Sequence, residues 1–165
     1  MSSEHEKHPR DLALEMAQQG RLIDMKSALA EYAGRLENSS MNPEFMQTTI
    51  ESHEKECYYA FFGKMIQDAK SACAEGNYTK MEIHFDTAHK IDLNVSAIDV
   101  RYRLKNAQEE CFVMIGLGHG TKTMIEVIQG FKYNPAEMAD MIQNCEAVVN
   151  KKKADAAKKA EEQKQ

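Results

Sequence analysis

The sequence lacks tryptophan, contains only three prolines in 165 residues, and has almost no stretch in which β-branched residues alternate with polar ones. Alternation with a period of two is the pattern of a β-strand, so its absence leaves little room for a sheet. Apolar residues instead recur at spacings of three and four along nearly the whole chain, which is the period of an α-helix. We therefore predict an all-α fold of about seven helices, either stacked antiparallel helical hairpins or an irregular helical bundle.

The chain also lacks any long hydrophobic run and any paired C-x-x-C motif. No segment approaches the roughly 18 apolar residues of a membrane span, and the N-terminal MSSEHEKHPRD has no apolar core of a signal peptide. Cysteines that are scattered singly on apolar helical patterns are typical of reduced, buried thiols in the cytosol. These four are Cys57, Cys73, Cys111 and Cys145. We therefore expect a soluble, cytoplasmic protein with no membrane span.

Positive charge is scarce outside the C-terminus. The formal net charge is -5, and the last fifteen residues hold six lysines against three acidic residues, or +3, which leaves about -8 for the rest. An acidic body lacks the broad positive field that phosphate binding requires. This balance argues against nucleic acid as the main partner.

The composition predicts one helical domain over residues 10–149. A polar, mobile N-terminus (1–9) precedes it, and a tail rich in Lys, Ala and Glu (150–165) follows as a fraying helix or as disordered chain. Asn42-Pro43 and Asn134-Pro135 are helix-start signals, because Asn caps a helix and Pro suits its first position. The helix after Asn42 would be roughly 50 Å long, so a kink or break near Gly63 is an open alternative.

The helix expected after Asn94 carries a narrow apolar seam in alternating steps of three and four. Its predicted end is the glycine-rich stretch GLGHG, residues 116–120, and a short helix from Thr121 to about Tyr133 is expected to follow. The predicted seam consists of Ala97, Val100, Leu104, Ala107, Cys111 and Met114.

Glycines mark a weak internal repeat. Placing Gly20 over Gly76 aligns Met25 with Met81 and Leu29 with Phe85. The same offsets counted from His119 give Met124 and Ile128. Helix-turn-helix units of this kind cannot bury their apolar faces alone and become stable when they stack.

The stretch GNYTKMEIHFDTAHKIDLN, Gly76–Asn94, resembles the second half of a tetratricopeptide repeat. It has glycine at the turn, Tyr78 two residues later, then Phe85, Ala88 and a closing Ile91-Asp92. A weaker echo begins at Gly20. The resemblance implies a non-catalytic protein that binds a peptide or helix of a partner in a groove lined by the first helices of the hairpins. It implies groove positions at Ile66, Lys70 and Cys73.

A basic patch, RYRLK, stands out in the acidic body. Arg101 and Arg103 could bind an acidic peptide or a phosphate. The patch could equally be a solvated helix face, because Lys105 and Glu109 lie one turn apart and can pair. Both interpretations stay open.

Two short motifs offer a metal-binding alternative. His53 and Cys57 lie one turn apart, in a pattern similar to the H-E-x-x-H of zinc hydrolases but with Cys in place of the second His. Asp86 and His89 have the i, i+3 spacing of carboxylate-bridged di-metal bundles, yet no second Asp/Glu-x-x-His exists in the chain. We favour packing roles for these residues and predict no resident metal or other cofactor.

The function predicted from the sequence is thus a protein-interaction module. A small chaperone or assembly factor that shields a hydrophobic partner is one alternative, suited by eleven adaptable methionines. A metal-binding bundle or enzyme is the other. A homodimer is also compatible with the sequence, since a second chain could cover an exposed apolar stripe.

Overall fold

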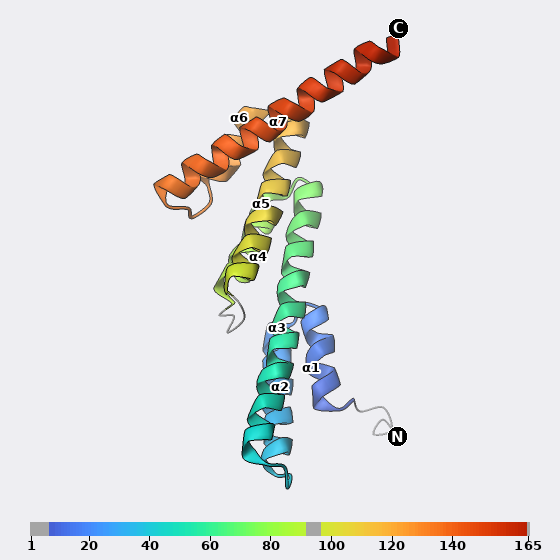
Figure 1. The fold of residues 1–165 in the computed structure, drawn as a ribbon, viewed down its shortest axis with the longest axis vertical. Coiled ribbons are helices and arrows are strands. Elements are labelled where there is room, and N and C mark those ends of the chain that lie inside the picture. The colour runs from blue at the N-terminus through green and yellow to red at the C-terminus, as the bar shows by residue number, and fades with distance from the viewer. Residues whose placement is uncertain (1–6, 92–96, 165) are drawn as a thin grey trace. The chain divides into compact units, whose positions relative to one another are not determined.

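The computed structural model describes residues 7–91 and 97–164 as seven helices with no strand between them (Figure 1). The all-helical prediction and its number of helices are therefore confirmed for this part of the chain. The helices are α1 (Pro9–Gln18), α2 (Leu22–Glu37), α3 (Pro43–Ala74), α4 (Tyr78–Lys90), α5 (Ala97–His119), α6 (Thr121–Gln129) and α7 (Pro135–Lys164). None of these described helices is long and apolar enough to cross a membrane.

Both predicted Asn-Pro helix starts are confirmed. The side-chain oxygen of Asn42 accepts a hydrogen bond from the backbone N–H of Glu44 at 2.9 Å. Asn134 accepts one from the N–H of Glu137 at 2.8 Å. Each asparagine thus satisfies one of the N–H groups that a helix start leaves without an internal partner.

Three glycines with positive φ each lie between two successive helices. Gly20 (φ 76°) and Gly76 (φ 79°) end α1 and α3, as the sequence predicts. The residue after each glycine donates a backbone hydrogen bond five positions back, the first to Met16 at 2.8 Å and the second to Ala72 at 2.9 Å. This bond closes the last helical turn, and glycine carries no side chain to oppose the left-handed conformation.

The third glycine with positive φ is Gly120 (φ 98°). The sequence predicts that the helix before it ends where the GLGHG stretch begins, but the helix is longer. Helix α5 continues through Gly116 and Gly118 and ends at His119, whereas α6 already ends at Gln129. Glycine is a poor helix former but costs only about 1 kcal/mol inside a helix. Packing around Gly116 offsets that cost, because a Cβ there would lie 2.8 Å from Cγ2 of Val149.

Helices α3 and α7 are long, with 32 and 30 residues. Helix α3 runs without interruption through Gly63, so a break at that residue is excluded. Helix α7 extends to Lys164, and its described residues from position 150 onward are all exposed. This last part projects beyond α5 and α6 in Figure 1.

The chain divides into two compact units, each with its own core. Unit 1 comprises residues 1–68 and 86–100, and unit 2 comprises residues 69–85 and 101–165. Helices α3, α4 and α5 contribute to both. In unit 1, α1 and α2 form a hairpin against the first part of α3 (Figure 1). Its large buried side chains include Met16, Met25, Tyr32, Phe61, Phe62 and Met65.

In unit 2 the core lies among the end of α3, the start of α4, and helices α5, α6 and α7. Rings of Phe85 and Phe112 both contact Phe131, with centroids 6.2 Å and 5.0 Å apart. The hydroxyl of Tyr133 donates a hydrogen bond to the side-chain oxygen of Gln108, one of the two buried polar residues identified in the described chain. The buried polar group therefore has a partner, as burial requires.

The predicted seam of α5 is correct up to Cys111 and wrong at its end. Val100, Leu104, Ala107 and Cys111 are buried, but Met114 is 47% exposed and Ile115 is buried instead. Alternating steps of three and four average 3.5 residues, whereas a straight helix has 3.6 per turn, so the buried stripe drifts along the helix. The stripe therefore continues from Cys111 to Ile115, four residues on, and Phe112 and Val113 beside it are buried as well. The side chain of Ala97 lies outside the described side chains.

The residues aligned by the glycine repeat occupy equivalent buried positions. Met25, Met81 and Met124 are each fully buried, and the next positions of the alignment, Leu29, Phe85 and Ile128, are buried as well. The repeat visible in the sequence therefore corresponds to a repeated packing role on α2, α4 and α6. Asp92 and Asn94, at the end of the tetratricopeptide-like stretch, lie outside the described residues.

Candidate functional site

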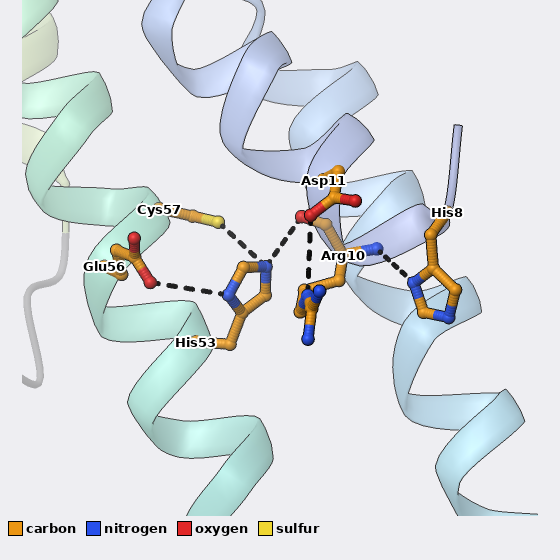
Figure 2. Close-up of polar contacts among 6 residues, drawn as sticks. All are labelled: His8, Arg10, Asp11, His53, Glu56 and Cys57. Atoms are coloured by element: carbon orange, nitrogen blue, oxygen red, sulfur yellow. Dashed lines mark hydrogen bonds and ion pairs between the residues drawn. The ribbon is translucent and has the colours of Figure 1, made fainter.

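The strongest metal candidate of the sequence, His53, is a buried core residue of unit 1 (Figure 2). Its Nε2 lies 2.8 Å from the backbone carbonyl of Arg10 in α1. A carbonyl only accepts, so this nitrogen carries the proton and donates. The other nitrogen, Nδ1, lies 3.7 Å from a carboxylate oxygen of Glu56. The ring also packs edge-on against Tyr32 of α2, with centroids 5.3 Å apart.

His53 therefore ties α3 to α1 and α2. The Nε2 of His53, which donates to the carbonyl of Arg10, also faces Cys57. The sulfur of Cys57 lies 3.5 Å from this nitrogen (Figure 2). A metal ligand needs a free lone pair on the nitrogen, and a donating N–H has none. The geometry supports the packing role for this histidine.

Cys57 is fully buried beside His53. Burial raises the pKa of its thiol to about 12, and the nearby carboxylates of Glu56 and Glu54 add to the rise. A thiol with this pKa is protonated at neutral pH, whereas nucleophiles and metal ligands are thiolates. Cys57 therefore has the character of a small apolar core residue.

The raised pKa of Cys57 predicts a loss of stability at alkaline pH. Below its ordinary pKa of 9.0 the thiol is protonated in both states, so its contribution to stability is fully present. Above that pH the unfolded thiol loses its proton while the native thiol keeps it. The free energy of unfolding should then fall by roughly 1.4 kcal/mol per pH unit until the native pKa of about 12 is reached.

Urea denaturation at pH 8 and at about pH 10.5, for the wild type and for Cys57→Ala, measures this effect. The variant removes the titrating thiol, so its stability should decline less with rising pH. Equal declines in the two proteins would show that Cys57 titrates normally in the native state.

The second metal candidate, Asp86 with His89, lies on the surface of α4. Asp86 forms an ion pair with Lys90 at 2.9 Å, and His89 is exposed on the same helix. Among residues 7–91 and 97–164, no group of three or more His, Cys, Asp or Glu side chains could hold a metal ion. The motif's spacing is present, but the additional ligands that such a site needs are not gathered around it.

The three groove positions implied by the resemblance differ in exposure. Ile66 in unit 1 and Cys73 in unit 2 are buried, so neither offers its side chain to a partner. Lys70 is partly exposed, and its ammonium lies 2.8 Å from the carboxylate of Glu110 on α5. Of these three positions, only Lys70 presents a charged group at the surface.

The two arginines of the RYRLK patch are exposed but point in different directions. Residues two apart on a helix are turned by roughly 200° about its axis. Arg101 and Arg103 therefore cannot belong to one surface, and the basic patch seen in the sequence is divided in the fold. Arg103 lies on the same side of α5 as Glu110, which is seven residues later.

Exposed side chains on that side of α5 form one continuous face, which the sequence analysis missed. We call it, together with Lys70 of α3, the α5 outer surface. Its members on α5 recur at steps of three and four residues and so lie along one side of the helix. They are Arg103, Asn106, Glu110, Met114 and Leu117.

The α5 outer surface is charged at one end and apolar at the other. Met114 and Leu117 are 47% and 42% exposed, whereas Arg103, Lys70 and Glu110 bring two positive charges and one negative. Of the six large apolar side chains identified as exposed in the described chain, three are on α5. The signal that reveals this face in the sequence is the step from Cys111 to Ile115, which moves Met114 out of the core.

No family model matches the chain, and no curated protein or solved structure does either. The resemblance to a tetratricopeptide hairpin therefore stays a prediction from the residues of Gly76–Asn94.

Proposed function

We propose that the protein is a non-catalytic interaction module whose α5 outer surface binds a helix or peptide of another protein. The observation that carries this proposal is the exposure of Met114 and Leu117, one turn apart, beside the charges of Arg103 and Lys70. Single exposed apolar residues are normal, but apolar anchors next to charged groups on one helix face are typical of helix recognition.

The position of Lys70 supports the same function. It lies on the end of α3 and pairs with Glu110 of α5, so these two helices are neighbours in unit 2. The resemblance implies that the first helices of successive hairpins line the binding groove, and α3 and α5 are those helices. The four cysteines are free, which fits the expected cytoplasmic location.

The chemistry of the surface supports one kind of partner. Two apolar side chains of a partner helix, one turn apart, would bury Met114 and Leu117, and the flexible thioether of Met114 can adapt to their shape. An acidic residue two or three turns away would approach Arg103 and Lys70. The partner segment is therefore an amphipathic helix or peptide that carries acidic residues toward one end.

Selection from a phage-displayed library of random peptides, each about 16 residues long and so roughly 24 Å as a helix, tests the proposal. We expect enrichment of peptides that combine paired apolar residues with Asp or Glu. Replacing both Met114 and Leu117 with glutamate should weaken a selected peptide at least about tenfold by fluorescence anisotropy.

A matched control uses two exposed apolar residues outside the surface. Ile23 and Phe45 in unit 1 are 80% and 63% exposed, so replacing both with glutamate adds the same charge elsewhere. This control variant should bind the selected peptide as the wild type does. A library that yields no binding peptide, or equal losses in both double variants, would refute the proposed surface.

A further inference from the structure

Two of the four cysteines meet where α3 and α5 contact each other in unit 2. The thiol of Cys73 lies 3.5 Å from the backbone carbonyl of Cys111, although 38 residues separate the two in sequence. Both side chains are buried. The thiols also share a hydrogen bond, which is the main effect on the ionisation of Cys73. The pair therefore brings two sulfur atoms together at a helix–helix contact.

The surroundings of the pair differ from those of the other two cysteines. The hydrogen bond from Cys111 lowers the pKa of the Cys73 thiol, and burial only partly opposes it. The same hydrogen bond, together with burial, raises the pKa of Cys111. By contrast, burial raises the pKa of both Cys57 and Cys145 to about 12, and no second thiol faces either of them among the described contacts.

Charged groups also lie next to the pair. Lys70 is one turn before Cys73 on α3 and pairs with Glu110, the residue before Cys111. Both side chains of this ion pair reach solvent, whereas the two cysteine side chains beside it are buried. A thiol of lowered pKa near a lysine, with a second thiol beside it, is the arrangement of a reactive cysteine and its resolving partner.

We propose that Cys73 and Cys111 are a redox-sensitive pair that a hydroperoxide converts to a disulfide joining α3 to α5. The Cys73 thiolate attacks one peroxide oxygen, so an S–O bond forms and the O–O bond breaks. This step gives a sulfenic acid and, after protonation, an alcohol or water. The Cys111 sulfur then attacks the sulfur of Cys73, the S–S bond forms, and the hydroxyl leaves as water.

The step balances as one two-electron reduction of a hydroperoxide by two thiols. The disulfide would fix the contact between α3 and α5 that lies beside the Lys70–Glu110 ion pair. Closing a covalent loop of this length restricts the unfolded chain and should raise the melting temperature of the protein by about 5 °C or more.

Treatment of the reduced full-length protein with one equivalent of hydrogen peroxide tests this inference. The chosen variant is Cys57→Ser/Cys145→Ser, which keeps only the proposed pair. We expect it to lose two hydrogens by mass spectrometry, to give a Cys73–Cys111 linked peptide, and to melt at a higher temperature until reductant is added. Cys73→Ser should form no intramolecular disulfide.

Circular dichroism tests whether Cys73→Ser remains folded. If it does not, the Cys57→Ser/Cys145→Ser protein decides alone, because its only two cysteines are the proposed pair. Absence of the linked peptide in that protein would overturn the proposal. An intramolecular disulfide that still forms in folded Cys73→Ser would overturn it as well.

Discussion

Replacing Gly116 with valine is expected to lower the free energy of unfolding by about 3 kcal/mol. Gly116 is buried inside α5, where even a Cβ atom would lie 2.8 Å from Cγ2 of Val149 and 2.9 Å from the sulfur of Met124. Both contacts are shorter than carbon and sulfur atoms allow. The branched side chain of valine would therefore push α6 or α7 away from α5 and disturb the core of unit 2.

Gly118 provides the matched control on the same helix. A Cβ there would meet nothing within 4 Å, and the residue is exposed. Gly118→Ala should therefore stabilise the protein by about 0.5–1 kcal/mol, because alanine is the better helix former. Urea denaturation followed by circular dichroism measures both changes. Similar effects of the two substitutions would mean that α5 does not pack on α6 and α7 at Gly116.

Replacing Phe112 with alanine is expected to cost about 3–5 kcal/mol. The ring is fully buried and meets Phe131 edge-on at a centroid distance of 5.0 Å. Removing it leaves a cavity between α5 and the segment after α6 and also removes an aromatic contact. Thermal and urea denaturation should both show the loss.

Met114 is the control for Phe112, and it tests the corrected register of α5. The sequence predicts Met114 in the core, but the structure places it at the surface and Phe112 inside. Met114→Ala should therefore change stability by no more than about 0.5 kcal/mol. If Met114→Ala lowered the free energy of unfolding by several kcal/mol and Phe112→Ala lowered it only slightly, the register predicted from the sequence would be supported instead.

Features set by neighbouring residues could be predicted from the sequence. Asn42 and Asn134 cap helices through a bond to a residue two or three positions on, and Gly20 and Gly76 adopt a backbone conformation that other residues resist. The fully buried Met81 follows from helical periodicity. Each of these depends on local chemistry that the sequence displays directly.

Features set by contacts between distant segments could not be predicted. Nothing near Gly116 in the sequence indicates Val149, so its place inside a helix could not be distinguished from a turn. The pairing of Lys70 with Glu110 and of Cys73 with Cys111 likewise depends on how α3 packs against α5. The candidate surface on α5 was missed for a different reason, which is the drift of the buried stripe that places Ile115 rather than Met114 in the core.

The α5 outer surface is tested most directly by the methyl resonance of Met114. The protein has eleven methionines. Met114 lies on the proposed surface, whereas Met25 is fully buried in unit 1. In protein labelled with ¹³C at the methionine methyl groups, Met114→Leu assigns the signal. Adding a library-selected peptide to saturation should shift the Met114 signal and leave that of Met25 in place. A peptide that binds tightly while the Met114 signal stays unchanged would contradict the proposal.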